Sequence, residues 1–254
     1  MNELWKPELP GFGVVAWLAP CLALWIWGSG LLAGWLKLNR GARTADTRKL
    51  IHFSVFSLAA LLKGTMGTPA VNLAGLLAAV YIAFCLWRGS GNLFFEAMAR
   101  ESDRPRRSLH ILIPFLATAA GGITAISAFG NFAVFGFAIC GLADAVAEPI
   151  GVRLGKRRYR TWNLPGCGDS YRSIEGSLAV FVASFIAAAI VQYTALTPLQ
   201  PVSFSDSLLP AAAIAAVAAL IEAISPHGTD NFTLQVAVSG AAFAWESLLP
   251  LAPA

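Results

Sequence analysis

Long stretches of apolar residues without charge constrain this chain more than any other feature. The first, residues 11–36, holds about 26 residues, enough for one helix to cross the hydrocarbon core of a bilayer. Further apolar runs, separated by charged, proline or glycine breaks, lie at 50–64, 68–87, 109–128, 130–152, 174–194, 207–224 and 230–249. We therefore predict an all-α polytopic membrane helix bundle with seven or eight transmembrane helices, because the second run is short for a crossing.

The composition agrees with lipid as the solvent. Only 13% of the residues are charged and the mean hydropathy is +0.65, whereas soluble domains carry roughly 25% charged residues. The first run lacks a basic start and a small-residue cleavage site, so we interpret it as an anchor and not as a removable signal. No internal repeat is visible, and we expect residues 1–254 to form a single integral membrane domain.

The positive charge is gathered in three breaks between apolar runs. Residues 37–49, 88–108 and 153–173 hold sixteen of the 18 lysines and arginines. The positive-inside rule predicts that these three basic loops are cytoplasmic. They contain no nucleic-acid-binding motif, so membrane topology and anionic ligands explain the charge better than nucleic acid does.

Two acids interrupt the fifth apolar run. A charge near the centre of a membrane helix costs roughly 2.5–3.5 kcal/mol on insertion scales, so Asp144 and Glu148 together need a reason. Their i, i+4 spacing places them on one helix face, where their oxygens can converge on a common cation or basic partner. Pro149 also leaves a backbone carbonyl free beside them. The plainer alternative is a structural ion pair with a loop arginine.

A second polar set opens the sixth run, where Arg172 and Ser173 precede Glu175, Gly176 and Ser177. Free N–H groups and the helix dipole attract phosphate to a helix N-terminus. The same residues also suit an ordinary cap with a first-turn acid, so both readings stay open.

Two further polar sets flank apolar runs and are expected at the same membrane face. They consist of Glu222, Asp230 and Asn231, and of Arg48, Lys49 and His52. Acids can hold Mg²⁺ through oxygen, and arginine and lysine can clamp phosphates. The four sets together predict a site for a nucleotide or polyphosphate that is open to both cytosol and lipid.

Four motifs in order resemble the CTP-dependent polyprenol kinase family. They are RKLIH at 48–52, GLADAVAEPIGVRLGK at 141–156, RSIEGSLAVF at 172–181, and a glutamate followed by Asp-Asn at 222–231. This family includes dolichol kinase, phytol and farnesol kinases and a CTP-dependent diacylglycerol kinase. The resemblance spans about residues 48–240. The family usually has Gly-Asp followed by a small residue, whereas Leu142 and Ala143 here separate Gly141 from Asp144.

The resemblance implies transfer of the γ-phosphoryl group of CTP to an isoprenoid alcohol such as phytol, farnesol, geranylgeraniol or a polyprenol. We expect an integral membrane enzyme, in a bacterial inner membrane, with its active site facing the cytoplasm. The candidate catalytic residues are Asp144 and Glu175, either of which would accept the alcohol proton. The candidate nucleotide and phosphate ligands are Arg48, Lys49, His52, Gly151, Gly155, Lys156, Arg172, Ser173, Gly176 and Ser177. The candidate Mg²⁺ ligands are Asp144, Glu148, Glu222, Asp230 and Asn231.

Three alternatives remain open at this point. The stretch TWNLPGCGDSY at 161–171 resembles the PGHGG-type stretch of CDP-diacylglycerol synthases, which keeps cytidylyl transfer as the second hypothesis. The acceptor of a kinase can also be diacylglycerol. Intramembrane acids further mark proton-coupled transporters, although those usually carry them near mid-membrane in repeated halves. The expected partners are CTP, the lipid alcohol and membrane lipids, and the sequence leaves room for a homo-oligomer.

Overall fold

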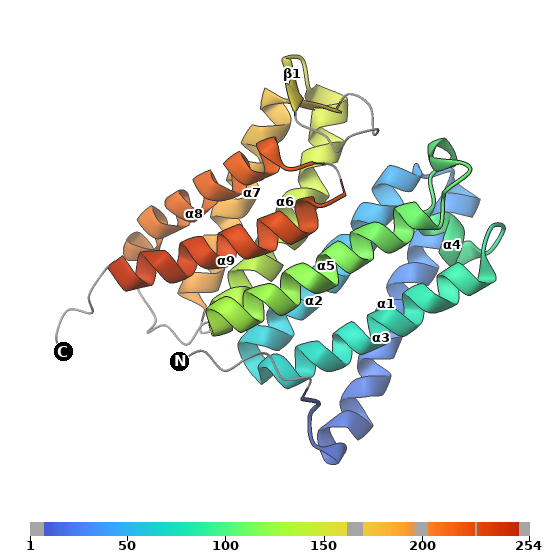
Figure 1. The fold of residues 1–254 in the computed structure, drawn as a ribbon, viewed down its shortest axis with the longest axis horizontal. Helices are drawn as coiled ribbons and strands as arrows, with labels where there is room; N and C mark the ends of the chain where they lie inside the picture. The colour runs from blue at the N-terminus through green and yellow to red at the C-terminus, as the bar shows by residue number, and fades with distance from the viewer. Residues whose placement is uncertain (1–7, 162–169, 195, 197–202, 227, 249–254) are drawn as a thin grey trace.

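Helices make up almost the whole fold in the computed structural model, which describes residues 8–161, 170–194, 196, 203–226 and 228–248. The α-helices are α1 (Phe12–Arg40), α2 (Thr44–Met66), α3 (Thr68–Arg88), α4 (Leu93–Met98), α5 (Leu109–Phe129), α6 (Ala133–Leu154), α7 (Ile174–Tyr193), α8 (Phe204–Ile224) and α9 (Asp230–Leu248). Short 3-10 helices η1 (Glu101–Asp103) and η2 (Gly130–Phe132) and strands β1 (Arg158–Thr161) and β2 (Ser170–Ser173) complete it. Figure 1 shows the long helices side by side in one bundle. The all-α prediction is confirmed.

Five segments of the described chain are long and apolar enough to cross a membrane. They are Phe12–Arg40, Thr68–Arg88, Leu109–Leu154, Ile174–Tyr193 and Ser205–Ile224. They indicate an integral membrane protein, but the prediction of seven or eight transmembrane helices is wrong. Two predicted crossings fall in helices with more polar character, since α2 contains Lys63 and α9 begins at Asp230. Two others, 109–128 and 130–152, belong to one continuous 46-residue segment in which η2 joins α5 to α6.

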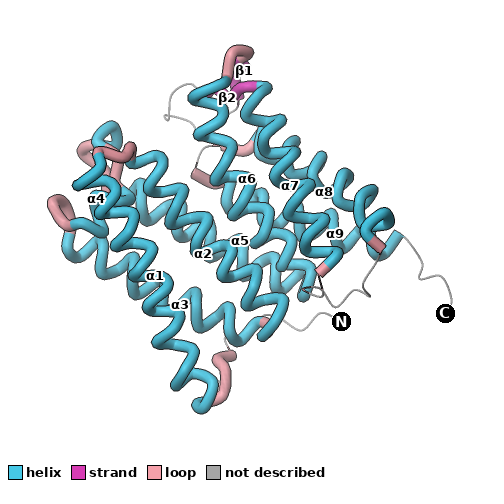
Figure 2. The backbone as a smooth tube through the Cα atoms, turned by 180° about the vertical axis from the view of Figure 1, so that it is seen from behind, coloured by secondary structure: helices cyan, strands magenta, loops and turns pink. Residues whose placement is uncertain are grey.

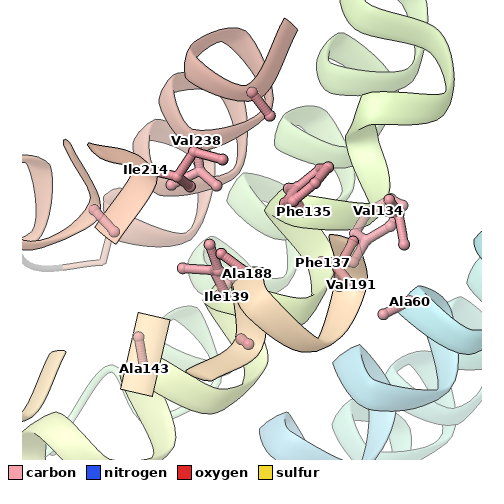
Figure 3. Packing of buried hydrophobic residues seen from close by; sticks show 14 of the residues in the cluster. Ala60, Val134, Phe135, Phe137, Ile139, Ala143, Ala188, Val191, Ile214 and Val238 are labelled. Atoms are coloured by element: carbon pink, nitrogen blue, oxygen red, sulfur yellow. The ribbon is translucent and has the colours of Figure 1, made fainter. Parts of the chain in front are cut away.

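Helix α6 forms the core of one part of the bundle, where it packs against α2, α7 and α9. Its buried apolar residues include Phe135, Ile139 and Ala143, which Figure 3 shows among side chains of the neighbouring helices. Small residues allow the backbones to approach closely, which is how helices associate in lipid. Gly136 is one of these, because a Cβ there would clash with Ser239 of α9. The tight packing fixes the position of the acids that follow in α6.

The short helix α4 is fastened beside α1 and α3 by a closed ion cluster around Arg107. This guanidinium is 6% exposed and makes a two-pronged contact with Glu96, with Nη2 2.5 Å and Nη1 3.2 Å from its two oxygens. Its remaining N–H groups donate to the carbonyls of Ala99 at 2.9 Å and Arg100 at 3.2 Å and to the Ser90 hydroxyl at 3.4 Å. Because each charge has its partner, the cluster serves as a structural tie.

Two of the basic breaks are shorter than predicted, because helices continue into them. Residues 37–49 span the end of α1 and the start of α2, and 153–173 begins inside α6. Lysine and arginine are good helix formers and can extend a helix beyond its apolar run. The third break then forms an antiparallel ribbon, with Tyr159 of β1 opposite Arg172 of β2. Figure 2 shows this ribbon at the same end of the bundle as α4. The predicted motif at 161–171 lies mostly outside the described residues.

Candidate functional site

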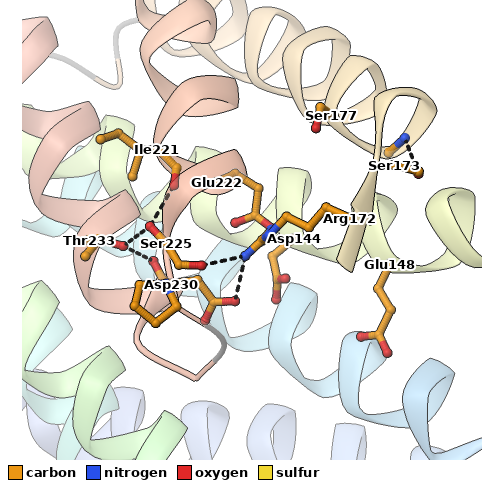
Figure 4. A network of polar contacts seen from close by, with 12 residues as sticks. Asp144, Glu148, Arg172, Ser173, Ser177, Ile221, Glu222, Ser225, Asp230 and Thr233 are labelled. Atoms are coloured by element: carbon orange, nitrogen blue, oxygen red, sulfur yellow. Dashed lines mark hydrogen bonds and ion pairs between the residues drawn. The ribbon is translucent and has the colours of Figure 1, made fainter. Parts of the chain in front are cut away.

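Three carboxylates from three helices meet near the ribbon end of the bundle. Asp144 comes from α6, Glu222 from α8, and Asp230 is the first residue of α9. One oxygen of each lies within 4.8 Å of the others. Figure 4 shows these acids gathered around Arg172. Like charges at such distances repel each other unless a cation lies among them, so this carboxylate cluster is a candidate cation site.

One positive group that contacts the cluster is the guanidinium of Arg172. It pairs with Glu222, and its Nη2 lies 3.9 Å from an oxygen of Asp230 and donates to the Ser225 carbonyl at 3.1 Å. The pairing of β2 with β1 delivers Arg172 to this position. The sequence predicts Arg172 as a phosphate ligand, whereas the structure shows it bound by acids.

Glu222 is not fully satisfied by its arginine. Its side chain is 7% exposed, and its Oε2 has no hydrogen-bond partner among the described residues. An unpartnered buried charged oxygen costs more than the roughly 1–3 kcal/mol of a neutral group. A ligand that approaches this oxygen would remove that cost, so Glu222 supplies an observation independent of the acid spacing.

The acids of α6 converge on a lysine of α2. The ammonium of Lys49 lies 2.5 Å from Asp144 and 3.5 Å from Glu148. The second oxygen of Asp144 lies 3.3 Å from Nε2 of His52, and this nitrogen also lies 3.2 Å from the Cys140 carbonyl. The i, i+4 spacing predicts convergence on a cation or a basic partner, and the described partner is Lys49.

Two further predicted metal ligands have hydrogen-bond partners of their own. Glu148 binds Arg100 at 2.8 Å in addition to Lys49, and it is not among the three grouped acids. Four residues along a helix is about 6 Å, which carries Glu148 away from the oxygens of α8 and α9. The amide of Asn231 donates to Thr118 at 2.9 Å. A metal-binding role for Glu148 is therefore not supported, and that of Asn231 stays a prediction.

A cavity of about 310 Å³ opens beside the carboxylate cluster, between α6, α7 and the ribbon. All three clustered acids line it, together with the cations of Lys49, Arg158 and Arg172. The predicted residues Gly151, Ser173, Gly176 and Ser177 line it too. We call it the first cavity. Its acidic residues are suited to bind a cation, and its basic residues are suited to bind an anion.

The start of α7 explains why small polar residues line the first cavity. Ser173 caps the helix by accepting a hydrogen bond from the Gly176 N–H at 3.1 Å. The hydroxyl of Ser177 is bonded to that of Tyr159 in β1 at 2.6 Å. Gly151 of α6 lies close to Ser173, so the two helices approach each other here. The cap reading of the sequence is confirmed, and phosphate binding by these hydroxyls stays a prediction.

Three predicted residues line neither cavity described here. Glu175, Gly155 and Lys156 are absent from the linings. The Glu175 carboxylate accepts the backbone N–H of Arg157 at 3.4 Å. Successive residues turn by about 100° around a helix, so Glu175 faces away from the side that Ser173, Gly176 and Ser177 share. The structure gives no support to Glu175 as a proton acceptor, and Lys156 is an exposed residue beyond the end of α6.

A second cavity, of about 380 Å³, lies on the other side of Lys49 and Asp144. Arg48 and His52, both predicted phosphate ligands, line this cavity and not the first. The cavities share four lining residues, which are Lys49, Asp144, Glu148 and Asp230. These charged groups therefore form the boundary between two spaces of different character.

Sequence reasoning missed several partners in this region. Arg100 pairs with Glu148, Arg158 lines the first cavity, and Tyr159 holds Ser177. The alternation of basic and other residues through β1 is a strand signal that a search for apolar runs overlooks. Nothing in the sequence indicates which of the loop arginines would reach Glu148, because that pairing depends on how α4 packs.

No family model, curated protein or solved structure matches this chain in comparisons with known proteins.

Proposed function

We propose that this protein is a CTP-dependent lipid kinase, which transfers the γ-phosphoryl group to an isoprenoid alcohol at the cytoplasmic face of a bacterial inner membrane. One observation carries the proposal. Three buried or half-buried carboxylates lie within 4.8 Å of one another, beside a cavity with basic walls, at the basic end of a bundle with five candidate membrane spans. Phosphoryl transfer requires this combination of acids and cations.

The carboxylate cluster fits Mg²⁺. Asp144, Glu222 and Asp230 offer hard oxygen ligands, which this ion prefers. The Oε2 atom of Glu222, which has no hydrogen-bond partner among the described residues, would be stabilised by a bound cation. When bound, the ion would neutralise negative charge on the phosphates. Glu148 and Asn231 are not needed for this site.

The cations around the first cavity would position the nucleotide. Arg172 can release its carboxylates and present two parallel N–H groups to a phosphate, and Arg158 lines the same wall. Lys49 lies between the two cavities and would neutralise charge where the group is transferred. Main-chain and hydroxyl groups at the start of α7 add the dipole of a helix N-terminus.

In the transfer step, the alcohol oxygen forms a bond to the γ phosphorus while the bond from that phosphorus to the β–γ bridging oxygen breaks. CDP leaves, and the alcohol proton passes to Asp144. Asp144 suits this role because it lines both cavities, whereas Glu175 lines neither.

The choice of CTP and of an isoprenoid alcohol is supported by the four ordered motifs. Lys49 and His52 of RKLIH, Asp144 of the second motif, Arg172 of the third and Asp230 of the fourth all lie around the two cavities. The motifs resemble the polyprenol kinase family in sequence order, and here they also meet in space.

The test uses purified protein with CTP that carries a label on either the α or the γ phosphate. Phytol, farnesol, geranylgeraniol, undecaprenol, diacylglycerol and phosphatidate are offered separately. We expect the γ label on an isoprenoid alcohol. The α label on a phospholipid would instead establish the cytidylyltransferase, and the γ label on diacylglycerol alone would correct the acceptor. No labelled lipid at all would reject the proposal.

The matched variants come from one helix. Asp230→Asn removes an acid of the cluster, and Glu246→Gln makes the same kind of change in α9 outside both cavities. Stabilisation of charge in phosphoryl transfer is worth a thousandfold or more, so we expect Asp230→Asn and Asp144→Asn to lower kcat by at least about a thousandfold. Glu246→Gln should keep wild-type kcat. Full activity in Asp144→Asn would exclude its role.

A further inference from the structure

The second cavity has one charged end and an apolar body. Its charged lining consists of the four residues shared with the first cavity together with Arg48, Arg100 and Asp103. Its body runs between α1, α2, α3 and α5, where apolar side chains line it. Among them are Ile26, Ile51, Val55, Ile82, Ile111 and Phe115. A ligand that matches this lining has a single polar end and an apolar remainder.

The cavity reaches the apolar outside of the bundle. Ile113 of α5 lines the cavity and is 49% exposed. It belongs to the segment Leu109–Leu154, one of the five candidate spans. An apolar chain can therefore pass into the cavity from the bilayer without crossing water, and its polar end would then meet Asp144.

The size of the cavity favours one chain over two. A volume of about 380 Å³ is at the lower end of the range for small-molecule sites, roughly 300–1,000 Å³. Ala78 of α3 lines this cavity but not the first. It lies ten residues before Arg88, the last residue of α3, which is a depth of about 15 Å from the basic end. Ala78 is therefore part of the wall along the chain, away from the reacting group.

We propose that the second cavity binds the apolar chain of the acceptor lipid, a single-chain alcohol, with its hydroxyl at Asp144, and that Ala78 contributes to the limit on chain length. This inference rests on the proposed kinase function for the identity of the polar end. The apolar chain site itself rests on the lining residues and the lateral opening.

The experiment compares Ala78→Phe with Ala79→Phe. Ala79 is the same residue type in the same helix, and it lines neither cavity. For each protein, kcat/KM is measured with geraniol, farnesol and geranylgeraniol as acceptors. One methylene in an apolar pocket changes kcat/KM by roughly tenfold or more. We therefore expect Ala78→Phe to lower the geranylgeraniol-to-geraniol ratio by at least about tenfold, and Ala79→Phe to keep the wild-type ratio.

A second measurement does not depend on catalysis or on a tolerated substitution. Wild-type protein is irradiated with a photoreactive isoprenoid alcohol, and the labelled peptides are mapped. Label on α2, α3 and α5 residues of the second cavity, competed by unlabelled geranylgeraniol, supports the chain site. Label confined to the outer surface of the bundle overturns it.

The outcomes separate the two proposals. If wild-type protein transfers phosphate but Ala78→Phe keeps the wild-type ratio, the chain-length role of Ala78 is wrong and the kinase stands. If no alcohol is phosphorylated but the cavity is labelled, the kinase is wrong and the lipid-chain site stands. Neither transfer nor label in the cavity rejects both.

Discussion

Arg107 and Arg172 are both arginines paired with glutamates at the same end of the bundle, yet their surroundings differ. Arg107 binds both oxygens of Glu96, and its other N–H groups donate to two backbone carbonyls and to the Ser90 hydroxyl. Arg172 pairs with Glu222 but leaves Oε2 of that residue without a described partner, and two more acids lie alongside. A closed ion cluster has nothing left to bind, whereas an open one can exchange its arginine for another cation.

The comparison is tested first at the closed cluster, where the largest effect is expected. Arg107→Met leaves the half-buried Glu96 carboxylate without the hydrogen bonds of its arginine, which costs about 3 kcal/mol of unfolding free energy. Thermal unfolding in detergent should show this loss equally with Mg²⁺ and with a chelator. The specific activity of the folded fraction should stay at the wild-type level, and a loss of activity without a loss of stability would remove the structural assignment.

The open cluster should respond differently to the same substitution. In the presence of a chelator, Arg172→Met leaves the three clustered acids without this counter-charge, so its unfolding free energy should be lower than that of the wild type. At a Mg²⁺ concentration a hundred times the Kd of the variant, binding should restore about 2.7 kcal/mol of unfolding free energy. The wild type should gain less at the same Mg²⁺ concentration, because its Arg172 competes for the same oxygens. If Mg²⁺ stabilises neither the wild type nor Arg172→Met, the cluster does not bind the ion, and equal gains in the two proteins would show that Arg172 does not compete with it.

A smaller effect is expected from pH at the closed cluster. Burial alone would raise the pKa of Glu96, but the hydrogen bonds from Arg107 and from the Gly91 N–H outweigh it and lower this pKa. A lowered pKa in the folded protein means that the charged carboxylate stabilises the fold above the unfolded value, about 4.3. That contribution is lost as the pH falls through the folded pKa.

The measurement follows the Tm of wild type and Glu96→Gln in detergent from neutral to acidic pH. The wild type should be the more stable at neutral pH, and the difference should shrink by a few degrees below about pH 4.3. A difference that stays constant over this range would show that the charge of Glu96 contributes nothing.

The positions of several helices could be predicted from apolar runs alone. The runs at 68–87 and 109–128 match α3 and α5 within one residue at each end, because apolar residues fill these helices from end to end. The start of α2 could not be found in this way. Its first turns are polar, and Thr44 precedes the apolar run by six residues. Fewer candidate crossings are found than predicted because α2 and α9 are more polar than their apolar runs indicate, and because the runs at 109–128 and 130–152 belong to one continuous segment.

The acids of the candidate site could be predicted from the sequence, but its cations could be predicted less well. Asp144, Glu222 and Asp230 stand out in the sequence because acids are expensive in apolar segments, and the structure brings them together. Their chemical role stays a prediction. Which of the many arginines joins them depends on the register of the ribbon, and a tertiary contact of this kind leaves no periodic signal. Glu175 lines neither cavity, because neighbours in sequence lie on different faces of a helix, and its role as proton acceptor stays a prediction.

The separation of 95 residues between Lys49 and Asp144 also bears on biosynthesis. The ribosome completes α2 well before α6, so the base is delivered to the membrane ahead of its acid. Until its partner is made, a lysine near a helix end can extend its long side chain and keep the ammonium group at the membrane–water interface. The side chain of an aspartate is too short to do so. Because Lys49 is synthesised first, Asp144 enters the membrane when its basic partner is already present.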